Sequence, residues 1–572
     1  VMAVTESWGR MGRRRGQRGI RPRRLLAGGV ALGLVLAACG GGDDDDAAET
    51  SSVSPGGDGT PTAGSTADPS GGSDGEAAPD AEALTVGVFR GLPRGFDPAF
   101  SGLPRSFSLL PVIEPLIAVD VTTGEFEPNL AEQFEQLDET TYTFDLRPGV
   151  EFSDGSPLTI EDVVYSIELH LDPAEESPLA EDLANIESVE ATGTEQITVR
   201  LQEPSILFLT SMSTVPIVKQ SVRESQGDGR GTPSALPVGT GPYIITEFTP
   251  DTLVVLERND GYWGEPAPIG TITLRSIEDE NTALAAFRAG ELDVVFDVPP
   301  LRSDQYEDAG TLVTAVDPEF TQVFFNRSIP PFDDVNVRRA IMHSIDVEGV
   351  INSVYGGFAQ PHPAIVAQDL LARLLPPDEV DALLGEVTIP YDMDLAREAL
   401  AQSSVPDGFE INTIVNAAEP DLRQFALAIQ DNLNELGITL NFEEVTQNQY
   451  TDEVFLQEPH IIGFGISTYG FNSYTPFEQI LGLTTPGFSN LADYGGPEID
   501  ELTARLSVLS PTDTEEMAEI IPEMLRQEAE DVVYGSVVAG ESISAIGEGW
   551  QYEGYSPAYV LGPWFRQLSS TG

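Results

Sequence analysis

Hydrophobic and polar residues alternate with a period of two along Thr141–Leu146, which reads TYTFDL. This period is typical of a strand that buries one face. A Pro148-Gly149 pair ends the strand, and a short strand is expected at 150–152. Thr159 precedes Asp162 by three residues, the spacing of a capping box at a helix N-terminus. The helix that follows is expected to bury Val163, Val164 and Ile167.

The same two periods recur along the rest of the chain and predict a mixture of strands and helices. Strands are expected at 84–89, 197–201 and 438–442, and helices at 337–345, 391–400 and 422–436. One helical face should contain Val337, Ala340, Ile341 and Ile345. With 572 residues, 41% of them hydrophobic, the chain is long enough for more than one domain. These patterns predict the α/β class.

The N-terminal segment has the order of a secretory signal peptide. Arginine-rich sequence is followed by the apolar run Leu25–Ala38, and then by Cys39. The string Leu-Ala-Ala-Cys resembles the bacterial lipobox, which implies that 1–38 are removed and that Cys39 carries a lipid. Residues 39–82 are rich in Gly, Ser, Asp, Thr and Pro, and we expect a disordered tether there. Cys39 is the only cysteine, so no intramolecular disulfide is possible.

The charge of the chain excludes one class of partner. Acids number 93 against 29 Lys and Arg, for a formal net charge of -64. A nucleic-acid-binding protein is expected to carry a basic surface, so we expect no nucleic-acid partner. The four histidines are far apart in the sequence and lack the spacing of metal ligands. We therefore expect no metal or cofactor, and surface or loop positions for His170, His343, His362 and His460.

One stretch carries a resemblance to a known family. Residues 141–167, TYTFDLRPGVEFSDGSPLTIEDVVYSI, are similar, nearly letter for letter, to the signature of the family 5 extracellular solute-binding proteins. These are the dipeptide-, oligopeptide- and nickel-binding lipoproteins of ABC importers. Further strings resemble this family at 113–116, at 239–243 (GTGPY), at 259–263 and at 331–341. The resemblance extends from about residue 84 to residue 550.

The resemblance implies a fold and a division of the chain. We expect a two-lobed periplasmic-binding-protein-like clamshell of type II with an extra small α/β subdomain. Lobe I would comprise 84–105, 236–310 and 506–572. The subdomain of lobe I would be 106–235, and lobe II would be 311–505.

The ligand site is expected where the sequence departs from the family. Oligopeptide-binding members place an aspartate, which pairs with the peptide ammonium group, at a strand end where this chain has Tyr469 or Gly470. A second acid, after the first-lobe turn, is also missing near residue 100. We expect ligand contacts of mostly aromatic and hydroxylic character, from Phe100, Ser101, Ile466, Ser467, Tyr469, Phe471 and Tyr474. The alternative is that the aromatic residues pack the core of the lobe.

Two arginines flank the first-lobe loop. Arg94 and Arg105 could meet a ligand carboxylate, and the alternative is that both are simply exposed.

The resemblance implies a binding protein and no enzyme. We expect a lipoprotein that captures a peptide or peptide-like small solute and delivers it to the permease and ATPase subunits of an ABC importer. It would act as a monomer outside the cytoplasm, held at the cell membrane by its lipid. A secreted hydrolase is one alternative, although no Ser-His constellation and no other catalytic residue is visible. A ligand sensor with the same fold is another.

Overall fold

The computed structural model describes residues 83–89, 92–97, 106–120, 123–175, 177–277, 279–457, 460–470, 475–487, 489–556 and 562–571. The predicted signal peptide, the tether and Cys39 lie outside the described residues. The same is true of the predicted site residues Phe100, Ser101, Phe471 and Tyr474, and of Arg105.

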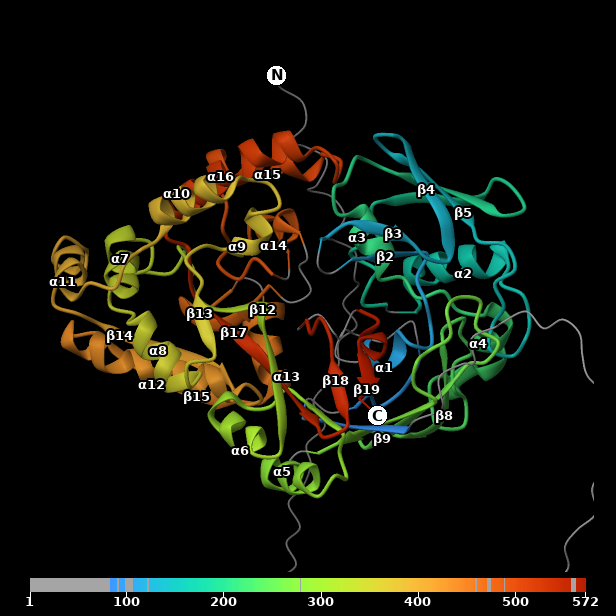
Figure 1. Ribbon diagram of the computed structural model, residues 1–572. Helices are drawn as coiled ribbons and strands as arrows, with labels where there is room; N and C mark the ends of the chain where they lie inside the picture. The colour runs from blue at the N-terminus through green and yellow to red at the C-terminus, as the bar shows by residue number, and fades with distance from the viewer. Residues whose placement is uncertain are drawn as a thin grey trace, which may run out of the picture. The chain divides into compact units, whose positions relative to one another are not determined.

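The largest sheet has nine strands in the order β16-β12-β17-β11-β1-β10-β9-β8, with β13 paired to β17 (Figure 1). Strand β1 is parallel to its neighbours β10 and β11, and the other described pairs of this sheet are antiparallel. The strands are β1 (Ala83–Val88), β8 (Tyr243–Thr249), β9 (Leu253–Arg258), β10 (Thr271–Ser276), β11 (Val294–Phe296), β12 (Gly310–Phe325), β13 (Ala359–Pro361), β16 (Phe464–Tyr469) and β17 (Tyr534–Gly547).

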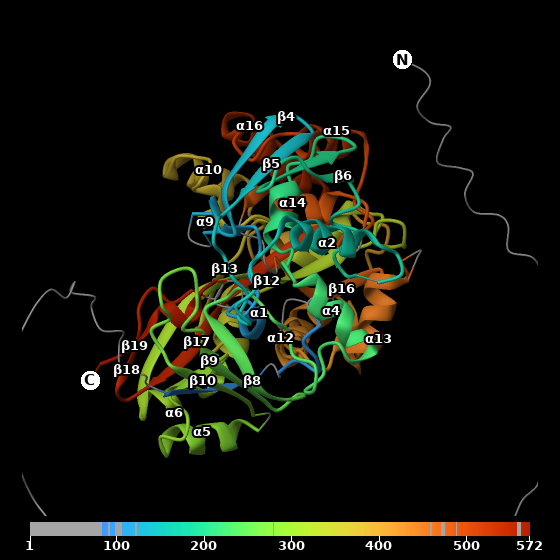
Figure 2. The same cartoon turned by 90° about the vertical axis from the view of Figure 1, so that its right-hand side faces the viewer.

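Two long strands, β12 and β17, run from the part of the sheet around β1 to the part around β16. Each part has its own hydrophobic core, and we call the two parts the first and the second unit. They pair along their length, with a register irregularity between Val316 and Phe320. On one side of the irregularity, β17 also pairs with β11. On the other side, β12 pairs with β16. The two strands therefore belong both to the part of the chain predicted as lobe I and to the part predicted as lobe II, and Figure 2 shows them from a second direction.

Helices cover both faces of the sheet around β16. One face, with Val323, Phe325 and Ile466, packs against α7, α8 and α12. The opposite face, with Phe324 and Tyr534, packs against α10, α14, α15 and α16. The helices of this part are α7 (Val335–His343), α8 (Val347–Val354), α9 (Gln368–Leu371), α10 (Pro377–Val387), α11 (Met393–Ala401), α12 (Pro420–Glu435), α13 (Gln447–Tyr450), α14 (Pro476–Thr484), α15 (Pro497–Ser507) and α16 (Thr514–Asp531). A parallel pair, β14 (Glu410–Asn416) and β15 (Thr439–Val445), completes it.

The packing of α16 differs from the predicted lobe boundary at residue 506. Met517, Ile520 and Ile521 of α16 lie in one core with residues of α10 and α15. The chain joins the core of the first unit only further on, through Ile546 of β17 and Trp564. The boundary between the two cores therefore falls within β17. A helix belongs to the core that covers its apolar face, whichever segment follows it in the sequence.

The first unit surrounds β1, β8, β9 and β10, and its core contains Val86, Tyr243, Leu274 and Trp564. Its short elements are α1 (Ser106–Leu109), α5 (Glu280–Arg288), α6 (Ser303–Glu307), β18 (Trp550–Tyr552) and β19 (Leu568–Ser570).

A separate four-stranded antiparallel sheet, ordered β4-β5-β7-β6, forms the predicted subdomain. Its elements are β4 (Ala131–Asp138), β5 (Thr141–Leu146), β6 (Ile186–Ala191), β7 (Gln196–Leu201), α2 (Ile160–Leu171), α3 (Phe208–Ser213) and α4 (Gln220–Gln226), with the hairpin of β2 (Ile117–Val119) and β3 (Phe126–Pro128) beside it. The predicted strand is present, but Thr141 and Thr143 are buried together with Tyr142 and Phe144. Because β5 lies between β4 and β7, Glu135 and Thr198 stand directly beside Thr143 on the face expected to meet solvent.

Several other predictions from the sequence are confirmed. The backbone N–H of Asp162 donates to Thr159 Oγ1 and that of Thr159 to the Asp162 carboxylate, at 3.3 and 3.2 Å, which is the expected capping box. The expected face of α7 and its following turn is buried at Val337, Ala340, Ile341 and Ile345.

The expectation of surface or loop positions is wrong at His170, which is buried within α2, whereas His362 and His460 lie in loops, as expected, but are buried there. His170, His362 and His460 are 0%, 5% and 9% exposed, and His343 is partly exposed. Sequence spacing tests for metal ligands but carries no information about burial. Among the described residues, no group of three His, Cys, Asp or Glu side chains could hold a metal ion.

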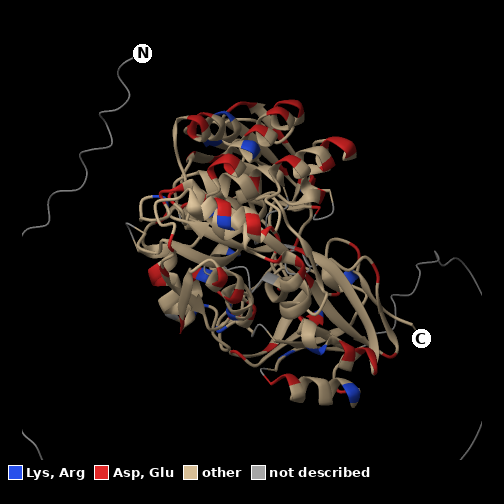
Figure 3. Ribbon diagram, turned by 90° about the vertical axis from the view of Figure 1, so that its left-hand side faces the viewer, with Lys and Arg blue, Asp and Glu red and all other residues tan. Residues whose placement is uncertain are grey.

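The acids are spread over the helices that Figure 3 shows, with few basic residues among them. In the described part of the chain, no helix combines the length and the apolar character that crossing a membrane requires.

Candidate functional site

The described residues of the predicted site lie on β16, and their side chains face opposite sides of the sheet. Ile466 is fully buried in the core shared with α12, and its carbonyl accepts a hydrogen bond from the Tyr450 hydroxyl at 2.8 Å. A side chain enclosed on all sides by core residues contributes packing. The structure therefore gives Ile466 a place in the core.

Ser467 and Tyr469 lie on the other face of β16. Ser467 is 2% exposed and accepts a hydrogen bond from Gln322 Nε2 at 3.3 Å. The Tyr469 hydroxyl donates to the carbonyl of Gln479 in α14 at 2.9 Å. A Cβ at Gly482 would lie 2.0 Å from this hydroxyl, so α14 needs glycine there to approach the ring. Both residues make contacts inside the lobe, which for Tyr469 is the alternative that the sequence left open, and the contact of either residue with a ligand stays a prediction.

Tyr469 also belongs to an aromatic row that the sequence analysis missed. Its ring meets the edge of Phe320 at 5.7 Å between centroids, and the other partner of Phe320 is His362, stacked at 4.1 Å. Burial lowers the pKa of His362 to about 4, against a smaller opposing effect of the backbone at Ala364. The imidazole is therefore uncharged at neutral pH. No sequence signal pointed to this row, because its members are far apart in the chain and meet through the pairing of β12 with β16 and of β12 and β13 with β17.

An acid does come close to the end of β16. Neither Tyr469 nor Gly470 is acidic, but the Thr468 hydroxyl donates to Glu419 Oε2 at 3.1 Å. The other oxygen of Glu419 accepts from Asn416 Nδ2 at 2.6 Å. Glu419 is only partly buried and comes from the turn before α12. Tyr469 thus stands where an aspartate is expected in oligopeptide-binding members, and its neighbour Thr468 is bonded to the carboxylate of Glu419.

A network of ion pairs holds the chain where it enters the predicted first-lobe loop. Asp97, three residues before Phe100, lies 3.4 Å from both Arg223 Nε and Arg230 Nε. Arg223 is 4% exposed and also pairs with Glu175 at 2.7 Å. Removing one partner from such a buried pair leaves an uncompensated charge, which is strongly destabilising. This network therefore fixes the residue that leads into the loop.

Arg94 is exposed, which is the second of the two possibilities that the sequence left open. Its side chain is 83% exposed and forms a surface ion pair with Asp251 at 3.2 Å.

Three of the strings that carry the family resemblance, 113–116, 239–243 and 259–263, meet at one buried carboxyl group, which we call the Glu114 joint. Glu114 accepts hydrogen bonds from the Thr240 hydroxyl at 2.8 Å, the Tyr262 hydroxyl at 2.8 Å and the Trp263 indole N–H at 3.0 Å. Burial raises the pKa of Glu114, and these three donors oppose that rise. The joint ties the chain that enters the subdomain to β8 and to the turn after β9.

The glycines of GTGPY serve the same joint. A Cβ at Gly239 would lie 1.9 Å from the carbonyl oxygen of Val112, and one at Gly241 would lie 2.4 Å from that of Pro111. Only glycine permits such an approach between two backbones. The interpretation of this string as a structural turn is therefore supported.

The architecture defines a class of protein, the type II periplasmic binding proteins, and the expected fold class is confirmed. Among solved structures, the ABC transporter substrate-binding protein CtaP from Listeria monocytogenes superposes with a TM-score of 0.73 and 21% identity, covering 86% of this chain and 100% of that chain. Residues 125–487 match the family described as "Bacterial extracellular solute-binding proteins, family 5 Middle". The chain belongs to this family, as the signature at 141–167 predicted.

Two relatives show the range of names within the family. A Brucella ovis protein named as an ABC transporter peptide-binding protein is 28% identical over 397 residues, 67% of this chain and 73% of the relative. Heme-binding protein A of Haemophilus influenzae is 26% identical over 448 residues, 72% of this chain and 79% of the relative.

Proposed function

We propose that this protein is the substrate-binding lipoprotein of an ABC importer, and that it captures a peptide or peptide-like solute outside the cytoplasm. The observation that carries the proposal is the family match over 125–487. The name of the Brucella ovis relative favours a peptide, and the name of the Haemophilus influenzae relative shows that related chains bind other solutes.

Capture would proceed by closure of two lobes about β12 and β17. These strands continue from the first packing unit into the second, and their pairing is irregular between Val316 and Phe320. Hinge closure requires a few residues, at the point where the chain passes from one lobe to the other, whose backbone angles can change. The domain assignment from the sequence is kept in this proposal with two changes: the boundary near residue 506 moves into β17, and the start of the subdomain moves from 106 to beyond α1, whose Phe107 and Leu109 pack in the first unit.

The ligand would contact Phe100 and Ser101 from the first lobe and Phe471 and Tyr474 from the second. The described frame supports this assignment, because Asp97 is anchored just before the first pair and Tyr469 just before the second. Ser467 and Tyr469 would position the site from beneath it, and Ile466 would contribute only to the core.

Delivery would require the lipid on Cys39 and the permease and ATPase subunits of the importer. The protein would act as a monomer and carry out no catalysis. Its anchor would be the lipid, since a chain with a net charge of -64 is repelled by an anionic membrane surface.

The test is mass spectrometry of the small molecules released from the purified protein, followed by thermal unfolding with the identified compound added back. A single co-purifying compound that raises the melting temperature supports the proposal. Turnover of peptide or glycoside substrates without any thermal stabilisation would contradict it and favour the hydrolase.

A further inference from the structure

The start of α3 joins two different cores. Phe208, Leu209 and Met212 pack in the core of the subdomain. Ile206, only two residues earlier, is fully buried in the core that α14, α15 and α16 form with the large sheet. Its backbone N–H donates to the carbonyl of Ser507, at the end of α15, at 2.9 Å. One short segment of the subdomain is therefore inserted into the packing of the second lobe.

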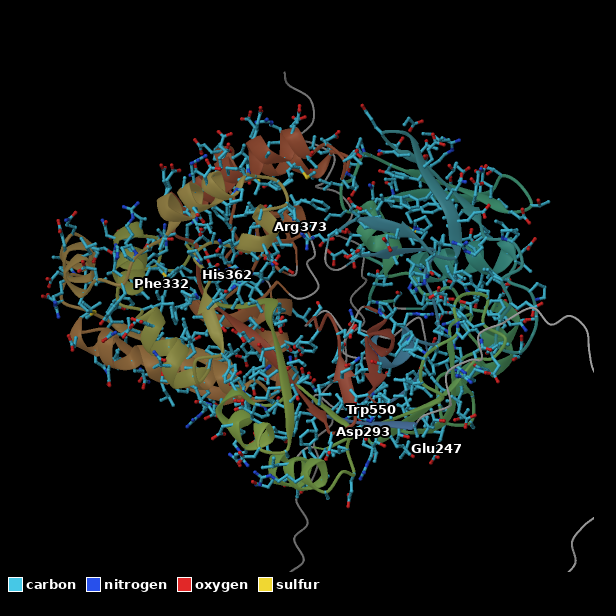
Figure 4. All side chains as sticks on the ribbon, viewed as in Figure 1. Glu247, Asp293, Phe332, His362, Arg373 and Trp550 are labelled. Carbon is cyan, nitrogen blue, oxygen red and sulfur yellow. The ribbon has the colours of Figure 1, made fainter. Side chains whose placement is uncertain are left out.

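A polar contact reinforces this insertion. The Thr210 hydroxyl donates to Glu478 Oε1 at 2.5 Å, across 268 positions of the sequence. Glu478 also accepts the backbone N–H of Thr475 at 3.1 Å in the capping box of α14. Arg373, labelled in Figure 4, lies close enough to Glu478 and to Asp120 of the subdomain to interact with both charges.

The subdomain is attached to the first unit by contacts of a different kind. The Glu114 joint centres on a buried carboxyl group, and the buried Arg223 pairs with the partly buried Asp97. A rotation about β12 and β17 that separated the lobes would leave those contacts intact. The same rotation would have to withdraw Ile206 from the second-lobe core and break the bond from Thr210 to Glu478.

We propose that Ile206, Thr210 and Glu478 form a clasp that holds the two lobes together, and that these residues determine how long a captured solute is retained. The role in retention rests on the proposed function, whereas the role in holding the lobes does not. Ile206 supplies the apolar part of the clasp, because opening exposes its whole side chain to water. Thr210 supplies a hydrogen bond to a carboxylate, which is stronger than one between neutral groups.

The clasp is tested by double electron–electron resonance on the full chain with Cys39→Ser, so that introduced cysteines are the only ones. Spin labels at Glu190→Cys and Asp381→Cys, both exposed, report the distance between subdomain and second lobe. Labels at Asp381→Cys and Asp431→Cys, both in the second lobe, report its integrity. The variants are Ile206→Ser and Thr210→Val. The matched control is Thr214→Val, whose hydroxyl bonds only to Ser211 in its own turn.

We expect one narrow distance between the lobes in the parent protein. Thr210→Val should raise the population at longer distances about tenfold, from the loss of one hydrogen bond to a charged group. Ile206→Ser should raise it by a larger factor, about tenfold to a hundredfold. Thr214→Val and the distance within the second lobe should not change. An unchanged distribution in Ile206→Ser, or the absence of the short distance from the parent protein, would overturn the clasp.

Retention is measured separately, as the amount of co-purifying small molecule per protein by mass spectrometry. We expect less of it in Thr210→Val than in Thr214→Val. Equal amounts alongside a lengthened distance would remove the role in retention and leave the clasp. The absence of any co-purifying molecule from the parent protein would count against the proposed function, while the distances would still decide on the clasp.

Discussion

Replacing Glu528 by glutamine should stabilise the protein at alkaline pH and leave it unchanged at acid pH. Glu528 lies near the end of α16 and is 7% exposed. Its Oε1 accepts the backbone N–H groups of Val533 and Tyr534 at 3.1 and 2.8 Å. The amide oxygen of glutamine can accept both bonds, so the substitution removes the charge and keeps the acceptor.

The expected magnitude follows from the pKa of Glu528. Burial, with a smaller effect of Asp531, raises this pKa from 4.5 to about 7, against the opposing effects of the two amides and Arg338. The folded protein then binds the proton more tightly than the unfolded chain. Stability from this group is therefore full below about pH 4.5 and is lost as the pH rises towards about 7. At ~1.4 kcal/mol per pKa unit, the loss is at most roughly 3 kcal/mol.

The assay is urea denaturation, followed by circular dichroism, at pH 5, 6, 7 and 8. The difference in unfolding free energy between Glu528→Gln and the parent protein should be smallest at pH 5 and grow by about 2–3 kcal/mol between pH 5 and pH 8. The other carboxyl groups cancel in this difference. Glu523→Gln, an exposed change on the same helix, is the control and should show no such growth. Parallel pH profiles for Glu528→Gln and the parent protein would refute the reasoning.

Three further predictions concern other parts of the molecule. Gly239→Ala should lower the melting temperature by several degrees or prevent folding, because its Cβ would lie 1.9 Å from the Val112 carbonyl oxygen. The control, Gly229→Ala, should be tolerated because its Cβ would meet nothing within 4 Å. Equal thermal unfolding of the two variants would contradict this. In calorimetry, an N-acetylated tripeptide should bind at least as well as its free-amine twin, because the family's ammonium-binding aspartate is missing; tight binding that is lost on acetylation would show that an acid such as Glu419 takes its place. Cys39→Ser should move the protein from the membrane to the soluble fraction, and unchanged membrane fractionation would disprove the lipid anchor.

Local chemistry determined much of the secondary structure and the family. The capping box of Thr159 and Asp162 is complete within four residues, so the start of α2 could be predicted from the sequence. The apolar spacing at Val337, Ala340 and Ile341 likewise predicted the buried face of α7. The family strings could be recognised because they build close backbone contacts, such as those of Gly239, that tolerate few substitutions.

Contacts between different elements decided what the sequence alone left open or predicted wrongly. A period of two indicates which residues of β5 share a face, but the neighbours that flank Thr143 on its own face, Glu135 and Thr198, come from the pairing with β4 and β7. Tyr469 stood at the expected strand end, and the position of α14 decided that its hydroxyl bonds to Gln479. Ile206 looked like any apolar residue of the subdomain, and its burial in the other core depends on where α15 ends. Periodicity reports the conformation of the neighbouring backbone, whereas the partner that covers a side chain belongs to another element, which lies from ten to about three hundred positions away in these examples.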